Sequence, residues 1–210
     1  ASIAGLNLTT EATQTSGVSN FGIIFTLGHN PNYAITSKFG TLAITPAPLS
    51  LLPPPDVARI YGRADPTLPA LNFGGLKNSD TIAGLVASYV NLPAPTADAG
   101  TYTYGVAIKN SNYRLTGATT GLFRVDPAPL DVQVAGDGRT YGDANPTSYT
   151  VNAQGLAFGQ TADQVLRVVN ATDQATGVGI YDLTARLLSK NYYFNSLSPG
   201  RFQVNPRLLS

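Results

Sequence analysis

An internal repeat with a period of about 80 residues is the feature that most constrains this chain. The run Tyr-Gly-Arg-Ala-Asp-Pro-Thr at residues 61–67 returns at 141–147 as Tyr-Gly-Asp-Ala-Asn-Pro-Thr, with five of seven positions identical. Other landmarks recur in the same order: Pro-Ala-Pro-Leu at 46–49 and 127–130, Gly-Leu at 75–76 and 155–156, Gly-x-Tyr at 100–102 and 179–181, and Asn-Tyr at 32–33, 112–113 and 191–192. Since a repeat of this length is one supersecondary unit, the chain is predicted to fold as a row of similar modules.

The landmarks set the module boundaries. Residues 46–126 and 127–205 each carry the full set, so we predict a complete module in each range. Residues 1–45 carry only the later landmarks and are expected to be the second half of a truncated module, and residues 206–210 resemble the start of a following one. A module of about 80 residues buries too little surface to be very stable alone, so contacts with neighbouring modules of the same protein are expected to support it.

Most of each module is predicted to be β-strand. Residues 130–134 alternate apolar and polar side chains, as a half-buried strand does, and the runs 102–108, 121–125, 181–187 and 200–204 do the same. Residues 148–151 are expected to form a second strand after the turn at Asn145-Pro146. The prolines at 53–55 require the opening strand of module 46–126 to be short or at a sheet edge.

One short helix is expected in each module. Thr161 with Gln164 three residues later is a capping-box pattern that opens a helix. The equivalent helix of the preceding module is expected to be capped by Ser79 or Asp80.

The joints between modules are predicted to be short. Pro-x-Pro follows the last strand of a module directly, without a Gly/Ser linker, and proline favours stiff, extended geometry. The tandem array is therefore expected to be an elongated rod. The half-module at 1–45 would expose unpaired strand edges, so we expect it to be poorly ordered or to be completed by a neighbouring segment or chain.

Composition excludes several classes of function. Charged residues make up 12% of the chain and the formal net charge is +1, so neither nucleic acid nor an anionic membrane surface is a predicted partner. No apolar run of 18 residues exists, which argues against membrane insertion. The absence of cysteine excludes disulfides, thiolate catalysis and cysteine-ligated metals.

No catalytic, metal or cofactor site is predicted. The one histidine, His29, lies in a Gly-His-Asn-Pro turn, and the one glutamate and the scattered aspartates form no close pair for acid–base chemistry. Asp137 and Asp143 flank a turn, which leaves calcium as a weak alternative, but they lack the alternating oxygen ligands of an EF-hand loop.

Residues that recur in every module are interpreted first as scaffold. Tyr61, Tyr141 and the tyrosines of the Asn-Tyr pairs (Tyr33, Tyr113 and Tyr192) are predicted to pack in the core with their hydroxyls hydrogen-bonded. The asparagines of those pairs (Asn32, Asn112 and Asn191) are expected to bond their own backbone at a bend.

The alternative is a ligand site built from aromatic residues that do not recur. Tyr89, Tyr149 and Tyr193 are the candidates, because an exposed aromatic ring can stack on a sugar. Tyr193 is expected on the strand face opposite Tyr192.

Taken together, the motifs resemble the MBG-type and related YDG-type repeats. These occur in tandem in large surface adhesins of Gram-negative bacteria that are similar to filamentous haemagglutinin. The resemblance implies a non-enzymatic protein that is secreted or held on the bacterial cell surface and supports attachment or biofilm formation. It also implies a β-grasp-like or immunoglobulin-like module, and the predicted helix favours the β-grasp-like form over a β-sandwich.

Two functions remain open at this point. The chain could be the stalk of an adhesin, or a module that binds extracellular polysaccharide, a partner protein, or a host or neighbouring cell surface directly. An accessory region of a hydrolase is a weaker third possibility.

Overall fold

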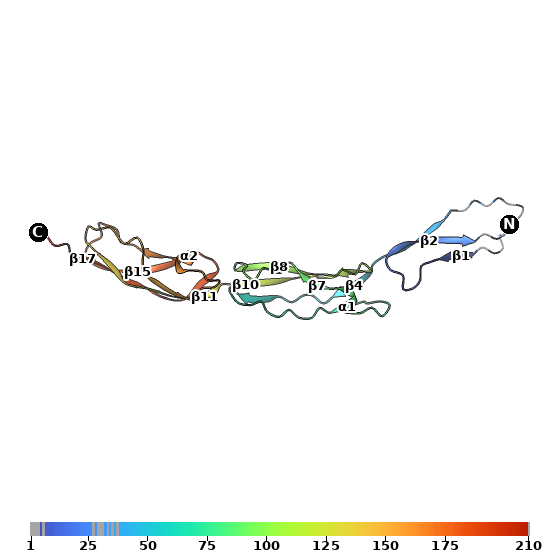
Figure 1. Cartoon of the computed structure of the whole chain (residues 1–210), viewed down its shortest axis with the longest axis horizontal. Coiled ribbons are helices and arrows are strands. Elements are labelled where there is room, and N and C mark those ends of the chain that lie inside the picture. The colour runs from blue at the N-terminus through green and yellow to red at the C-terminus, as the bar shows by residue number, and fades with distance from the viewer. Residues whose placement is uncertain are drawn as a thin grey trace. The chain divides into compact units, whose positions relative to one another are not determined.

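The computed structural model describes residues 5, 7–26, 28, 32, 34, 36 and 38–209 (Figure 1). His29 and Tyr33 lie outside the described residues. The chain divides into two compact units, one of residues 1–55, 69–91 and 104–121 and the other of residues 56–68, 92–103 and 122–210. The described residues are mainly β-strand with two helices of four residues, which confirms the predicted fold class.

The first unit begins with a three-stranded antiparallel sheet. Its strands are β1 (Asn7–Thr10), β2 (Ser19–Thr26) and β3 (Gly40–Ile44), in the order β1-β2-β3. None of their residues is fully buried. Among the described residues, the outer edges of β1 and β3 pair with no further strand. The expectation that a neighbour completes this half-module stays a prediction.

The rest of the first unit holds one hydrophobic core. Strand β4 (Ala47–Leu51) lies between β6 (Phe73–Gly74), to which it is antiparallel, and β9 (Tyr113–Thr116), to which it is parallel. Helix α1 (Ile82–Leu85) is followed by β7 (Ser88–Val90), which pairs antiparallel with β8 (Gly100–Ala107). The core consists of Leu49, Leu51, Phe73, Leu85, Val106 and Tyr113.

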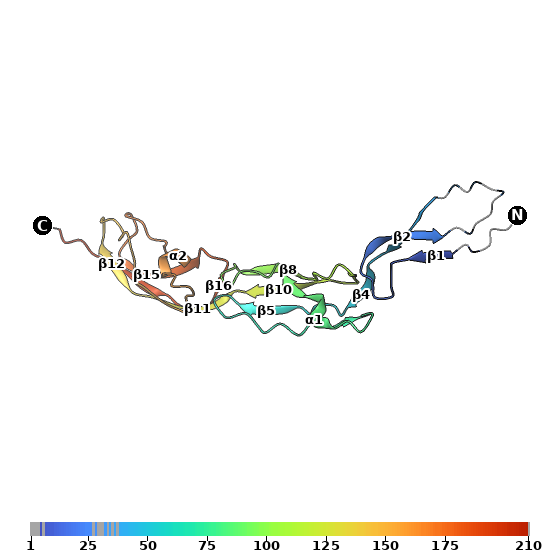
Figure 2. The same cartoon turned by 45° about the vertical axis from the view of Figure 1, so that its right-hand side comes forward.

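The second unit contains a complete set of module strands (Figure 2). Strand β11 (Ala128–Val134) lies between β13 (Val151–Gln154) and β16 (Tyr192–Ser198). A four-stranded sheet has the order β12 (Asp137–Thr140), β17 (Gly200–Asn205), β15 (Gly179–Leu187) and β14 (Leu166–Asn170). Helix α2 (Ala162–Val165) precedes β14. The same unit includes β5 (Val57–Ile60), which runs parallel to β10 (Thr120–Asp126).

The strand pairings repeat from one predicted module to the next. Strand β4 pairs with β6 and β9 as β11 pairs with β13 and β16, antiparallel on one side and parallel on the other. Likewise β5–β10 corresponds to the parallel pair β12–β17, and β7–β8 to the antiparallel pair β14–β15. Residues 127–205 combine features of both expected topologies, since their strands divide between two sheets and one short helix follows β13.

Alternation of side chains explains where the core of the second unit forms. Buried and exposed residues alternate strictly along β11, as the sequence predicts, because successive side chains point to opposite faces of a strand. Leu130 on β11, Val165 on α2, Leu183 on β15 and Phe202 on β17 are each fully buried.

The second strand of module 127–205 begins later than predicted. Strand β13 starts at Val151 instead of Ser148. The Tyr149 ring packs edge-on against Phe202, with 6.3 Å between the ring centroids, and its hydroxyl accepts a hydrogen bond from Asn170 Nδ2 at 2.8 Å. Because Tyr149 is committed to these contacts, the backbone joins the ladder only from Thr150, whose carbonyl accepts the Ala135 N–H.

The predicted N-cap is confirmed for one helix and wrong for the other. At α2, Gln164 Oε1 accepts the Thr161 N–H at 2.9 Å, which confirms the predicted capping arrangement. At α1, the N-cap is Thr81, so the prediction of Ser79 or Asp80 is wrong. Ser79 has a φ of 64°, which an extended N-cap cannot have, and the Asp80 carboxylate accepts a hydrogen bond from the Tyr113 hydroxyl instead.

The prolines at 53–55 shorten the opening strand of module 46–126, as predicted. Strand β4 ends at Leu51 after five residues, whereas its counterpart β11 has seven. Although short, β4 lies between two neighbours and not at an edge.

Candidate functional site

The Asn-Tyr pair at 191–192 forms a joint with loops of the preceding repeat. Asn191 Oδ1 accepts the Ala99 N–H at 2.7 Å, and its Nδ2 donates to Asp98 Oδ1 at 2.7 Å. Asn191 is 6% exposed and Ala99 is 7% exposed, so water does not compete strongly for these bonds. All of these residues belong to the second compact unit.

Aromatic packing accompanies the Asn191 bonds. The Tyr61 ring meets Phe158 and Tyr192 edge-on, with centroid distances of 5.2 and 5.5 Å. Such T-shaped pairs add about 0.5–1.5 kcal/mol each beyond the area that they bury. The hydroxyls of Tyr61 and Tyr192 both donate to Gln160 Oε1, so one side-chain amide joins both rings.

Gly62 lets the two loops approach closely. Its φ is 78°, which favours glycine, and a Cβ added there would lie 2.4 Å from the Ala157 Cβ. The recurring Tyr-Gly therefore has a reason in packing: tyrosine supplies the ring and glycine leaves room for the facing loop.

The first compact unit repeats the main polar bonds of this joint around the Asn-Tyr pair at 112–113. Asn112 Oδ1 accepts the Val18 N–H at 2.9 Å, as Asn191 accepts that of Ala99. The Tyr113 hydroxyl accepts the Lys77 N–H at 2.8 Å and donates to Asp80 Oδ2 at 2.7 Å.

The Tyr192 hydroxyl bonds in the matching way. It accepts the Ala157 N–H at 2.9 Å and donates to Gln160. Two stretches of chain about 80 residues apart thus build one bonding pattern twice.

The interpretation of the recurring asparagines was therefore wrong for two of the three. Asn112 and Asn191 bond amides that lie 94 and 92 residues away in sequence. Their own bends are held by other side chains: Asn110 Oδ1 accepts the Asn112 N–H, and Ser189 Oγ accepts the Asn191 N–H. The asparagine amide groups are therefore available for the joint.

The recurring tyrosines are core residues with one exception. Tyr61, Tyr113 and Tyr192 are buried, with exposures of 6, 6 and 3%, as predicted. Tyr141 is 44% exposed, so its placement in the core was wrong. Tyr61 is covered by Phe158 and Tyr192, and among the described residues no equivalent pair of rings covers Tyr141.

Two buried arginines were missed in the sequence. Arg59 and Arg139 stand two residues before the recurring Tyr-Gly and are 5 and 7% exposed. Arg139 donates to Asn145 Oδ1 at 2.8 Å and to the Thr140 and Asp173 carbonyls, and so ties together the loops that contain Asn145 and Asp173. The signal was present as Arg-x-Tyr-Gly in both modules.

Arg59 makes contacts that correspond to those of Arg139. Its Nε lies 2.8 Å from Asp65 Oδ1, and its Nη2 donates to the Ala94 carbonyl at 2.7 Å. Asp65 corresponds to Asn145 in the repeat, so the guanidinium keeps its place whether the partner is charged or neutral.

The three candidate ligand-binding tyrosines are not brought together. Tyr89 belongs to the first unit, donates to the Pro69 carbonyl at 2.8 Å and lies beside Tyr104, with 5.7 Å between ring centroids. Burial raises the pKa of the Tyr89 hydroxyl. Tyr193 is 49% exposed on the face of β16 opposite the buried Tyr192.

Tyr149 lines an open cleft of about 560 Å³ in the second unit. The cleft is also lined by Ser148, Asp163, Arg167 and Leu188. Tyr149 is therefore the candidate placed beside both charged and apolar groups.

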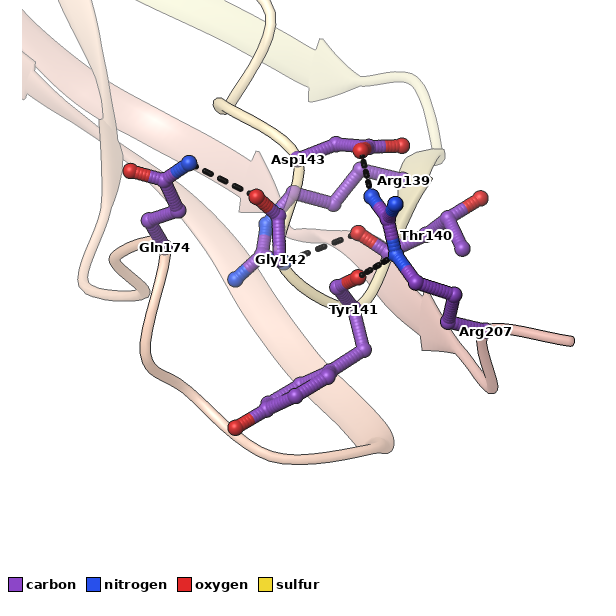
Figure 3. A network of polar contacts seen from close by, with 7 residues as sticks. All are labelled: Arg139, Thr140, Tyr141, Gly142, Asp143, Gln174 and Arg207. Carbon is purple, nitrogen blue, oxygen red and sulfur yellow. Dashed lines mark hydrogen bonds and ion pairs between the residues drawn. The ribbon is translucent and has the colours of Figure 1, made fainter. Parts of the chain in front are cut away.

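Within residues 5–209, the described ones contain no group of three or more His, Cys, Asp or Glu side chains that could hold a metal ion. Asp143, one of the two aspartates considered for calcium, is paired with Arg207 (Figure 3). Neither described helix has the length and apolar character to cross a membrane.

The model of the MBG domain (YGX type) family matches residues 53–124 and 130–203, which is more than half of the chain. The chain belongs to this family. The two MBG domains are in tandem, as the resemblance implied. No curated protein matches the chain.

The joint should lose stability when the asparagine amide is removed. In Asn191→Ala, the Ala99 N–H and the Asp98 carboxylate lose their partner, and we expect a cost of about 1–3 kcal/mol. Urea unfolding measures the free energy, and amide hydrogen exchange at Ala99 reports the joint itself. The exposed Asn152 on β13 gives the matched control, Asn152→Ala. An unchanged Ala99 exchange rate in Asn191→Ala would contradict the role of this side chain.

The joint tyrosines should make the fold sensitive to alkali. Burial raises the pKa of the Tyr113 and Tyr192 hydroxyls above the ordinary value of 10.0. The folded chain therefore holds these protons more tightly than the unfolded chain, so stability is complete below pH 10 and falls as the pH rises above it.

Urea unfolding between pH 8 and pH 11 measures this dependence. Tyr113→Phe with Tyr192→Phe should lower stability at pH 8, because the hydroxyl bonds are lost, and should flatten the fall above pH 10. Tyr193→Phe, on the exposed face of β16, is the control. A double variant as steep as the original chain would refute the assignment.

Proposed function

We propose that this chain is the non-catalytic stalk of a large extracellular bacterial adhesin and supports attachment or biofilm formation. The observation that carries the proposal is the joint, in which an Asn-Tyr pair makes matching bonds at corresponding positions of two repeats. MBG repeats typically occur in extracellular surface proteins, which supports a place at the bacterial surface. In this role the chain holds a binding region away from the cell.

The backbone path through the joint suits a load-bearing part. Strand β10 ends at Asp126 and β11 begins at Ala128, so Pro127 is the whole linker. The Asp126 carbonyl accepts the Tyr61 N–H and the Ala128 N–H donates to the Asn191 carbonyl, both at 2.8 Å. Tension in β10 therefore passes through one stiff residue into the next sheet, while hydrogen bonds on both sides resist bending.

A stiff joint should give one inter-module distance in solution. The chain has no cysteine, so Thr103→Cys and Gln133→Cys on exposed strand positions admit a pair of fluorophores. We expect a single narrow peak in single-molecule energy transfer. Adding Tyr61→Ala and Asn191→Ala should broaden it, because both the packing and the amide bond are lost. Equal widths for the two proteins would count against the stalk.

The cleft beside Tyr149 supports direct ligand binding as a second candidate. It places an aromatic ring, Arg167 and Asp163 around a space of about 560 Å³, a combination that suits an extracellular polysaccharide. On a glycan array, binding that is lost in Tyr149→Ala and kept in Tyr89→Ala and Tyr193→Ala would establish this function. Absence of binding by the original chain would leave the stalk as the function of these modules.

A further inference from the structure

One end of the second unit carries the residues of the joint without their cover. Tyr141, Gly142 and Val178 correspond to Tyr61, Gly62 and Ala99, and we call them the open end. Tyr141 is 44% exposed against 6% for Tyr61, and Val178 is 57% exposed against 7% for Ala99. The tyrosine and the residue at the Ala99 position are thus buried in one copy of the repeat and exposed in the next.

The backbone of the open end already has the geometry of the joint. The Tyr141 N–H donates to the Asn205 carbonyl at 2.8 Å, as that of Tyr61 does to Asp126. Gly142 has a φ of 87°, close to the 78° of Gly62. The open end therefore needs little rearrangement to receive a partner, which lowers the entropy cost of binding.

Polar contacts hold the backbone of the open end, and none of them involves the Tyr141 ring. Gln174 Nε2 donates to the Gly142 carbonyl at 2.6 Å, and Arg207 Nε donates to the Tyr141 carbonyl at 2.9 Å. Figure 3 shows the Tyr141 ring directed away from Arg207, Asp143 and Gln174. The ring is thus presented to whatever binds there.

The Val178 N–H corresponds to the amide that donates to an asparagine side chain in the joint. Val18 and Ala99 each give their N–H to an asparagine, whereas Val178 N–H has no hydrogen-bond partner among the described residues. Gly177 precedes Val178 as Gly17 precedes Val18, and a Cβ on Gly17 would lie 3.0 Å from Asn112 Oδ1. The glycine leaves space for an incoming amide.

The segment beside the open end is exposed in the same way. Leu209 is 98% exposed, while its counterparts Leu49 and Leu130 are fully buried. Leu130 lies on β11, which pairs in parallel with β16, the strand that begins at the Asn-Tyr tyrosine. A strand of this kind beside residues 206–209 would cover Leu209.

We propose that the open end binds the Asn-Tyr corner of another MBG module. The asparagine amide takes the Val178 N–H, the tyrosine ring packs edge-on against Tyr141, and the strand that follows pairs with residues 206–209. The inference rests on the proposed function and extends it: each module carries a donor end and an acceptor end, so modules join head to tail.

The test extends the full chain. A second copy of residues 132–210 is appended after Ser210, which preserves the natural run at 206–210 and supplies a further Asn-Tyr corner. Amide hydrogen exchange at Val178 is compared in the original and extended chains. We expect it to slow by about tenfold or more on extension, since a new hydrogen bond must open before exchange. The appended copy's Asn191→Ala should restore the fast rate, and its Asn152→Ala should not.

A second extension guards against failure of the first to fold. A copy of residues 51–126 appended after Ser210 brings the Asn112-Tyr113 corner in place of Asn191-Tyr192. Folding of either extension is checked by slow exchange at its own core strands. Fast Val178 exchange in a folded extension overturns the inference. If Ala99 stays protected in that molecule, the stalk survives; if Ala99 also exchanges fast, the joint and the proposed function fail together.

Discussion

The rest of this structure depends on one hydrogen bond, from a backbone amide of one repeat to the asparagine side chain of the next. Ala99 is buried and gives its N–H to Asn191, and a buried amide without a partner costs about 1–3 kcal/mol. The two lone pairs and two N–H groups of asparagine suit this position, because Asn191 can take the Ala99 amide and still donate to Asp98. The buried Ala99 amide thus takes its partner from the next repeat.

This dependence explains why the recurring residues lie at the ends of the modules as well as in their cores. Tyr61 and Gly62 both contact the next repeat: Tyr61 packs against Phe158, and Gly62 makes room for Ala157. Neither contact would exist in an isolated module. Arg59 and Arg139 hold the loops that present Tyr61 and Tyr141, and each donates to a carbonyl of a second loop, at Ala94 and Asp173. The repeat therefore encodes an assembly surface together with a fold.

Sequence could predict the tandem repeat, its β-rich fold and the α2 cap, because alternation and turn residues act over a few positions. It could not predict the asparagine bonds, which join residues more than 90 positions apart through a contact that no local pattern reveals. The buried arginines escaped notice because arginine is rarely buried, although their recurrence two residues before Tyr-Gly was visible. Tyr141 shows a different limit: its motif matches that of Tyr61, and burial depends on what lies opposite.

The contrast between Tyr61 and Tyr141 separates two kinds of information in a repeat. Sequence determines the loop backbone, since Gly62 and Gly142 share a left-handed φ and both tyrosine amides bond the end of the last strand. Burial of the tyrosine ring stabilises the fold by removing apolar surface from water, and this burial requires a neighbouring module. A module with a preformed but uncovered end gains stability when a neighbour covers that end. The same physical asymmetry that leaves Tyr141 exposed therefore gives a tandem array both its cohesion and its direction.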